Sequence, residues 1–133
     1  MTVVVDASVA AQWVLDEPST ERALALRGDE TLIAPSLIAS ELGNALWKAV
    51  RRGGVTRADA LAAMNTILVP FEALVPVEDL RNRALELAIE LDHPIYDCFY
   101  LALAERERCP LVTADKRLVA ATKKFKGVEV RAL

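Results

Sequence analysis

The amino-acid sequence predicts an α/β fold built on a central parallel sheet. Short runs that are apolar at nearly every position alternate with longer segments whose apolar residues recur every three or four positions. Continuously apolar strands are buried on both faces, which is typical of a parallel sheet covered by helices. The length of 133 residues is that of one domain, so we expect a single α/β domain over residues 1–133.

Five short runs are expected to form the strands, and proline or glycine marks most of their ends. Pro35 closes the second run, Pro76 interrupts the third, and Pro110 and Gly127 precede the last two. Proline lacks the N–H that a strand ladder needs and glycine permits tight turns, so both residues are typical of strand ends. The expected strands cover residues 2–5, 32–34, 73–77, 111–113 and 128–131.

Six longer segments are expected to be helical. Gly28 should end the first helix and Gly53-Gly54 the second, because glycine favours the position that follows a helix. Thr56 and Asp59 resemble a capping box at the start of the third. The expected helices cover about residues 18–27, 36–52, 56–69, 78–91, 94–107 and 116–125.

Composition and charge exclude several classes of protein. Apolar residues make up 53% of the chain and charged residues 26%, which excludes disordered and low-complexity proteins. A formal net charge of −3 rules out a strongly basic nucleic-acid binder, but it leaves room for a local basic strip or a bound cation. A single histidine gives little material for a histidine-rich metal site or a Ser-His-Asp triad.

The start of the chain and its cysteines predict a cytoplasmic protein. No apolar run approaches the ~18 residues of a membrane-spanning helix, and residues 1–5 lack the basic start of a signal peptide. Cys98 and Cys109 should lie roughly 16 Å apart along one helix, too far for a disulfide. Unpaired cysteines fit a reducing compartment.

Two aspartates follow strands of the predicted sheet. Asp6 comes directly after the first strand, and Asp115 comes at the end of the fourth. Open α/β sheets bind ligands at the carboxyl ends of their strands, so both carboxylates meet at one crevice if these strands are neighbours. Alternatively, each aspartate caps the helix that follows it, since Asp is a favoured N-cap residue.

Two further acids lie on predicted helices. Asp97 interrupts the segment 95–104, which is otherwise apolar all round and therefore expected to be buried. An unpaired carboxylate there would cost several kcal/mol, so Asp97 requires a basic side chain, a group of donors or a metal. Glu41 shares one helix side with Asn44 and Lys48, and a solvated polar face is the ordinary explanation for such a stripe.

Together, Asp6, Glu41, Asp97 and Asp115 favour a site for a hard cation. Several carboxylates in one pocket repel one another unless a cation compensates them. Oxygen-only ligands select Mg²⁺ or Mn²⁺. Such ions commonly act on phosphoesters, because they lower the pKa of a bound water and neutralise charge on phosphate oxygens.

The segments that carry these acids resemble the PIN-domain ribonucleases, and among them the VapC toxins of prokaryotic toxin–antitoxin pairs. The segments occur in the family's order and span nearly the whole chain. Each is weak alone, whereas four in register are fairly specific for the family. They are VVDAS at 4–8, PSL at 35–37 with ELGNAL at 41–46, YDCFYLALA at 96–104 and TADKRL at 113–118.

The resemblance implies a three-layer α/β/α sandwich whose parallel sheet has the order 3-2-1-4-5. That order makes the strands before Asp6 and Asp115 neighbours. It also implies a set of metal-binding and catalytic acids with three supporting polar residues beside them. The acids are Asp6, Glu41, Asp97 and Asp115, and the supporting residues are Ser8, Asn44 and Thr113.

The activity implied by the resemblance is metal-dependent endonucleolytic hydrolysis of RNA, with Mg²⁺ or Mn²⁺ as cofactor. The implied partners are RNA, a small cognate antitoxin and a second copy of the chain in a homodimer. A second hypothesis stays open, in which the chain is a non-toxin or non-catalytic PIN-like module that binds protein or RNA. A receiver-like phosphoacceptor domain is disfavoured, because Ala7 and Ser8 follow Asp6 where that class needs a second acid.

Other residues have ordinary explanations beside functional ones. We expect His93, before Pro94, to cap a helix or lie at the surface rather than act as a base. Tyr96 and Trp13 are more typical of core than of base stacking. Trp13 and Trp47 are our candidates for the walls of an apolar antitoxin groove, from which a partner's Arg or Lys enters the acidic pocket.

Two groups of basic residues fit RNA contacts and solvated helix ends equally well; they are Lys48, Arg51, Arg52, Lys116, Arg117, Lys123, Lys124 and Lys126.

Overall fold

A five-stranded, all-parallel sheet with the strand order β3-β2-β1-β4-β5 forms the centre of the computed structural model, which describes residues 1–133. The order predicted from the family resemblance is therefore confirmed. The strands are β1 (Thr2–Val5), β2 (Thr31–Pro35), β3 (Phe71–Val75), β4 (Leu111–Thr113) and β5 (Val130–Ala132).

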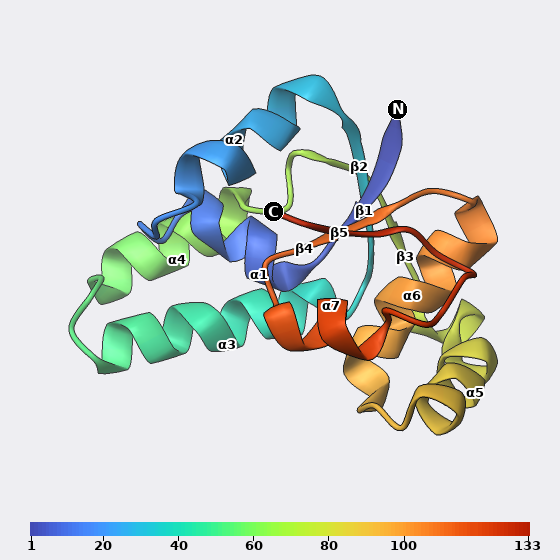
Figure 1. Cartoon of the computed structure of the whole chain (residues 1–133). Helices are drawn as coiled ribbons and strands as arrows, with labels where there is room; N and C mark the ends of the chain where they lie inside the picture. Colours follow the sequence, from blue (N-terminus) through green and yellow to red (C-terminus); the bar gives the residue numbers. More distant parts are fainter.

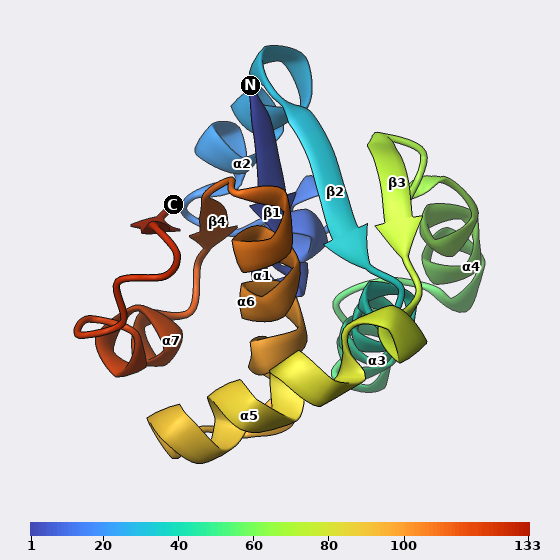
Figure 2. The ribbon, with the colours of Figure 1, turned by 90° about the vertical axis from the view of Figure 1, so that its right-hand side faces the viewer.

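Helices cover both faces of this sheet. In Figure 2, α6 (Ile95–Glu107) crosses in front of β1, whereas α1 (Ala7–Ala10) and α2 (Thr20–Asp29) lie behind the strands. Helix α5 (Arg81–Leu91) packs along α6, and α7 (Lys116–Ala121) packs against β4 and β5. The three layers that the fold class predicts are present.

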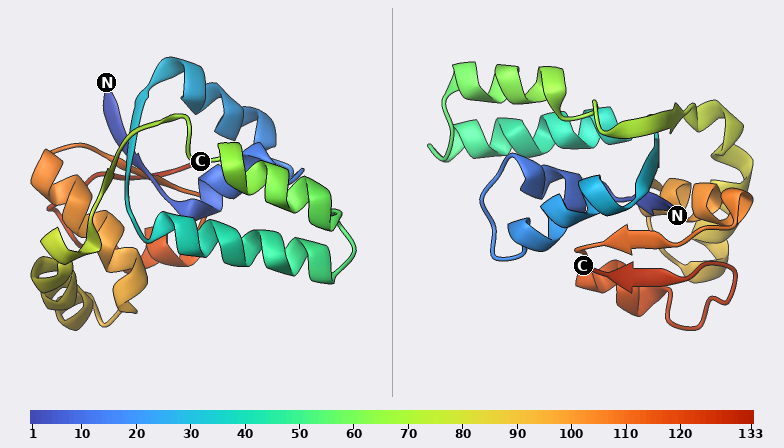
Figure 3. Two further views of the ribbon diagram at one scale, coloured as in Figure 1. Left: turned by 180° about the vertical axis from the view of Figure 1, so that it is seen from behind. Right: turned by 90° about the horizontal axis from the view of Figure 1, so that it is seen from above.

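Helices α3 (Ile38–Arg51) and α4 (Arg57–Thr66) form an antiparallel pair that extends beyond the sheet (Figures 1 and 3). The cap expected at the start of α4 is present, since the backbone N–H of Asp59 donates to Thr56 Oγ1 at 3.1 Å. Gly53 follows α3 with a φ of +81°, a backbone conformation that favours glycine. The sequence signals at both ends of this hairpin loop are thus confirmed.

Gly28 does not end the first predicted helix. It lies inside α2, which continues to Asp29, and its backbone is not left-handed. The helix ends instead because Glu30 adopts an extended backbone, with φ −129° and ψ 155°, that leads directly into β2. Two short helical turns after β1 were also not predicted: they are α1 and the 3-10 turn η1 (Ala11–Trp13).

Further boundaries differ from the sequence prediction by two to four residues. Helix α4 ends at Thr66, and β3 starts at Phe71, directly after Pro70; proline disfavours a helical backbone in the residue before it. A 3-10 turn, η2 (Val77–Asp79), takes up the first predicted residues of α5. Helix α7 ends at Ala121 and β5 begins at Val130.

The buried core lies between the sheet and its helices. It includes all of Val3, Val4 and Val5 on β1 and most of α6 from Cys98 to Ala104. Cys98 and Cys109 are both free, as predicted. None of the helices has the length and apolar character needed to cross a membrane.

Candidate active site

Asp6 lies at the carboxyl end of β1, in the middle of the sheet. Because Val5 pairs with Val112 in the neighbouring strand β4, the next residues of the two strands, Asp6 and Thr113, come side by side. The backbone N–H of Asp6 donates to the Val112 carbonyl at 3.1 Å, and the residue is only 4% exposed. The strand pairing therefore fixes this carboxylate in a buried position.

Two hydroxyls hold the Asp6 carboxylate. Ser8 Oγ donates to Asp6 Oδ2 at 2.9 Å, and Thr113 Oγ1 donates to the same oxygen at 2.7 Å. Each hydroxyl also accepts a backbone N–H from the turn after β4: Ala114 reaches Ser8, and Asp115 reaches Thr113, both at 3.0 Å. The hydroxyls are thus oriented as donors to Asp6.

Glu41 and Asp97 bring two more carboxylates to Asp6, from α3 and α6. Burial raises the pKa of Asp6, hydrogen bonds from Thr113 and Ser8 oppose that rise, and the charge of Asp97 adds to it. Burial also raises the pKa of Glu41 to about 7, partly offset by a hydrogen bond from Tyr100, with Asp6 and Asp97 raising it further. Three acids from three separate elements therefore act on one another.

Each helix-borne acid has one side-chain partner that the sequence analysis did not place in the site. Tyr100 Oη donates to Glu41 Oε1 at 2.6 Å. His93 Nε2 lies 2.6 Å from Asp97 Oδ2. The spacing on α6 is the signal that points to them, since His93 lies four residues before Asp97 and Tyr100 three after.

The prediction that His93 caps a helix or lies at the surface is wrong. Its side chain is 14% exposed and faces Asp97, because the turn before α6 brings position 93 onto the same helix side as position 97. The expectation that Asp97 needs a partner is confirmed, and a basic side chain supplies it.

Asp115 and Asn44 lie at the edge of the site. Asp115 Oδ1 accepts the backbone N–H of Arg117 at 2.9 Å, so this carboxylate caps α7, as the alternative explanation from the sequence had it. Asn44 is exposed one turn after Glu41, and no hydrogen bond holds its side chain. The structure brings together Asp6, Ser8, Glu41, Asp97 and Thr113, with Asp115 joined to them through its backbone N–H.

The donor chemistry of this pocket fits a hard cation. Its groups are carboxylate and hydroxyl oxygens, and no Lys or Arg forms an ion pair with Asp6, Glu41 or Asp97. No three acidic, imidazole or thiol side chains lie close enough to hold one ion directly. A cation here would therefore be held partly through water, which is the usual manner of Mg²⁺.

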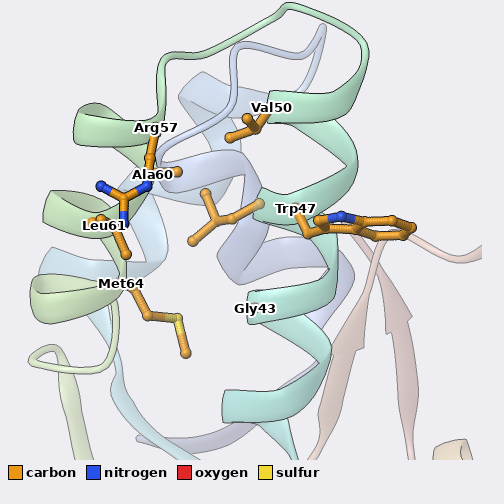
Figure 4. A pocket seen from close by; sticks show the side chains of 8 residues that line it. Gly43, Trp47, Val50, Arg57, Ala60, Leu61 and Met64 are labelled. Atoms are coloured by element: carbon orange, nitrogen blue, oxygen red, sulfur yellow. The ribbon is translucent and has the colours of Figure 1, made fainter.

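A second feature is an apolar groove between α3 and α4. Figure 4 shows Leu61 and Met64 of α4 pointing towards α3, with Val50 on the facing side. The hollow measures about 460 Å³ and is lined by Gly43, Leu46, Trp47, Val50, Arg57, Ala60, Leu61 and Met64. Trp47 is 53% exposed, and its ring extends from the side of α3 that faces away from α4 (Figure 4).

Trp13 lies in the core, as its apolar surroundings predicted, and is therefore not a wall of this groove, contrary to the second prediction for this residue. It is 9% exposed, its Nε1 donates to the Ala23 carbonyl at 2.8 Å, and its ring lies 5.5 Å from that of Phe71. The unpredicted turn η1 carries Trp13 into the core. Tyr96, in contrast, is 63% exposed rather than buried.

Comparison with known families shows where this arrangement belongs. Residues 3–124 match the model of the PIN domain. The chain belongs to the PIN-domain family. Among curated PIN relatives, Ribonuclease VapC9 of Mycobacterium tuberculosis is 35% identical over 116 residues, which is 87% of each chain. Ribonuclease VapC3 of Pyrobaculum aerophilum is 34% identical over 121 residues, covering 89% of this chain and 92% of the relative.

Solved structures show the same PIN fold. PAE2754 from Pyrobaculum aerophilum superposes with a TM-score of 0.72 at 30% identity, covering 98% of this chain and 83% of that one. VapBC2 from Rickettsia felis, bound to a DNA fragment from its promoter, also superposes with a TM-score of 0.72. Its identity is 16%, with 100% of this chain and 99% of that chain covered, and this likeness concerns the fold alone.

Proposed function

We propose that this PIN-domain protein is a metal-dependent endoribonuclease that hydrolyses RNA phosphodiester bonds and is the toxin of a VapBC-type toxin–antitoxin pair. The observation that carries the proposal is the meeting of Asp6, Glu41 and Asp97, from three elements, without a compensating Lys or Arg. The relatives named VapC ribonucleases match this chain over most of its length.

Mg²⁺ or Mn²⁺ is the proposed cofactor, since PIN-domain nucleases generally depend on divalent metal. Asp6, Glu41 and Asp97 would hold it, directly or through water, and Asp115 would complete the acidic set from the rim. When bound, the ion lowers the pKa of an attacking water and neutralises charge on the phosphate in the transition state.

The chain's own residues supply the remaining functions. Ser8 and Thr113 orient the Asp6 carboxylate through their hydroxyls. A carboxylate of the acidic set would accept the proton of the attacking water. No nucleophilic side chain is required.

RNA needs cationic contacts on this acidic protein. Lys48, Arg51 and Arg52 line a hollow at the end of α3, the helix that carries Glu41, and none of the three forms an ion pair. Arg51 also lies over the ring of exposed Trp47, 5.3 Å from its centroid. We propose that this strip binds RNA phosphates, with Trp47 available to a base.

The groove between α3 and α4 is the proposed seat of the antitoxin. Its lining is mostly apolar, and its first residue on α3, Gly43, lies two positions after Glu41, so an amphipathic helix of a partner placed there would lie near the acids. A partner's Arg or Lys inserted among the acids would offset their repulsion and compete with the metal. If that basic residue of the partner is changed to Ala, the intact complex should show ribonuclease activity. Unchanged inhibition would show that the partner blocks the site sterically and not through this charge.

A homodimer is also proposed. Leu85 and Ile89, four residues apart on α5, are 54% and 73% exposed, an apolar pair that a second copy of the chain can cover. Light scattering at micromolar concentration and moderate salt should give twice the mass of one chain, and a monomer mass would count against the dimer.

The proposed activity is tested with purified protein free of any partner. RNA cleavage should require Mg²⁺ or Mn²⁺ and stop in excess EDTA. Asp97→Asn should strongly reduce cleavage, whereas the matched control Asp92→Asn should not, because Asp92 is exposed in a left-handed position that Asn also tolerates. Full activity in EDTA would refute the metal mechanism, and no cleavage under any condition would favour a non-catalytic binding module.

A further inference from the structure

Glu41 depends on a single contact for its orientation. Its one hydrogen bond is accepted from Tyr100 Oη at 2.6 Å, and no Lys or Arg pairs with it. The charges that act on it belong to Asp6 and Asp97, and both repel it. A glutamate with three rotatable bonds and only repulsive neighbours would turn towards water without that contact.

Tyr100 is well placed to provide a fixed point. It is fully buried, with 0% of its surface exposed, and lies on α6 three residues after Asp97. The helix that carries Asp97 therefore also carries the hydroxyl that holds Glu41. Packing accounts for the aromatic ring, and the hydrogen bond that the hydroxyl donates goes to Glu41.

The donor–acceptor distance indicates a strong contact. At 2.6 Å it lies in the range of hydrogen bonds from a hydroxyl to an ionised carboxylate. Such a bond keeps the Glu41 carboxylate facing Asp6 and Asp97 while it carries a negative charge.

We propose that Tyr100 is a positioning residue whose hydroxyl holds Glu41 against the repulsion of Asp6 and Asp97, so that the three acids are arranged before a cation binds. The inference rests on the proposed nuclease function and deepens it. Tyr100 acts through Glu41 and does not itself touch RNA or the cation.

Tyr100→Phe tests the proposal, because it keeps the buried ring and removes only the hydroxyl. Tyr96→Phe is the matched control, since Tyr96 lies on the same helix with its side chain exposed. Mn²⁺ affinity, measured by electron paramagnetic resonance without RNA, should weaken about 10–100-fold in Tyr100→Phe, as for other residues that orient a ligating carboxylate. The kcat should fall by a similar factor with an unchanged KM for RNA, and Tyr96→Phe should match the wild type in both.

A double variant separates action through Glu41 from a general effect on the fold. In a Glu41→Gln background, adding Tyr100→Phe should change the Mn²⁺ affinity less than about twofold. Tyrosine absorbance provides a second measurement. The chain has two tyrosines, so the Tyr96→Phe variant retains Tyr100 alone. Adding Mn²⁺ to that variant should change its near-ultraviolet tyrosine absorbance.

Three results would overturn the role of Tyr100: wild-type Mn²⁺ affinity and kcat in Tyr100→Phe, an equal loss with and without Glu41, or a large drop in melting temperature that marks the hydroxyl as structural. In each case the wild type still binds Mn²⁺ and cleaves RNA, so the proposed function survives. A wild type that neither binds Mn²⁺ nor cleaves RNA would refute both.

Discussion

Asp6 and Glu41 reach the same pocket by different means. Asp6 follows a central strand, and the pairing of β1 with β4 supplies two hydroxyls that hold its carboxylate. Glu41 extends from α3 and relies on one hydroxyl of another helix. A strand-borne acid is thus fixed by backbone pairing, whereas a helix-borne acid is fixed by a single side chain.

This difference predicts unequal tolerance to change. The hydroxyls of Ser8 and Thr113, which hold Asp6, also accept backbone N–H groups of the turn after β4, so removing one of these hydroxyls disturbs the fold as well as the site. The Glu41 site is half-buried at the end of a long side chain, so altering it changes charge and orientation with less effect on the fold.

The largest effect is expected for Asp6→Asn. Cleavage of RNA should fall about 10²–10³-fold, the size expected when a group that stabilises transition-state charge is lost. The metal-free variant should melt at a higher temperature than the wild type, because removing a buried charge relieves repulsion. Paired cleavage assays and thermal melts in EDTA measure both, and wild-type cleavage would show that Asp6 is not in the site.

Asp115→Asn should have a smaller effect, about a 10-fold loss of cleavage, because this carboxylate lies at the rim. The melting temperature should stay the same, since Asn caps a helix as well as Asp does. A loss as large as that of Asp6→Asn would place Asp115 among the central acids when RNA and metal are bound.

Thr113→Val tests the hydrogen bonds that hold Asp6 at the ends of β1 and β4. The change removes one donor to Asp6 and one acceptor of the Asp115 N–H, which should lower the free energy of unfolding by about 1–3 kcal/mol. Cleavage should fall only severalfold, since Ser8 still holds Asp6. Thr122→Val is the control, because Thr122 is also buried and its hydroxyl bonds only within its own helix. Equal effects of the two changes on cleavage would argue against the role of Thr113.

The last prediction is a pH dependence of the stability of the metal-free protein, which concerns unfolding and not cleavage. Glu41 has a pKa raised from 4.5 to about 7 in the folded state, so it binds its proton more tightly when folded. Its contribution to stability is present below the unfolded pKa and is lost as the pH rises through about 7. Melting temperatures in EDTA should therefore decline between about pH 5 and about pH 8.

Glu41→Gln should flatten that decline, whereas Glu72→Gln, at an exposed position on β3, should leave it unchanged. Saturating Mn²⁺ should reverse the trend, because metal and proton compete for the carboxylates. The same slope in Glu41→Gln and the wild type would assign the pH dependence to other groups.

The local sequence determined much of the fold. β1 and β4 match their predicted bounds, and the Thr56 cap and Gly53 mark the hairpin of α3 and α4. These features depend on neighbours in the chain: β-branched runs, a capping hydroxyl and a left-handed glycine. Gly28 did not end helix α2, because its backbone does not turn left-handed there. The helix ends instead where Glu30 adopts the extended backbone that leads into β2.

The acids of the candidate site were also proposed from the sequence, each on a different ground. Asp97 interrupts an apolar segment, Asp6 and Asp115 follow strands, and Glu41 entered the set through the family resemblance. The apolar surroundings of Asp97 were enough to predict that it needs a partner. Helical spacing from Asp97, four residues back to His93 and three forward to Tyr100, places these two side chains on the same side as Asp97. What the sequence did not decide is which acids converge. Glu41 and Asp6 lie 35 positions apart, and only the packing of α3 against the turns after β1 brings their charges close enough to act on each other.

Only the tertiary structure determined that Trp13 is buried and Trp47 is exposed. Both are aromatic residues in apolar surroundings, yet η1 turns Trp13 onto Phe71 and Ala23, while Trp47 stays exposed on α3. Local sequence sets which backbone conformations and charges are favourable, since these depend on a few adjacent residues. Which side chain is buried and which acid meets another depends on contacts between distant segments, whose free energy appears only when the sheet and its helices pack together.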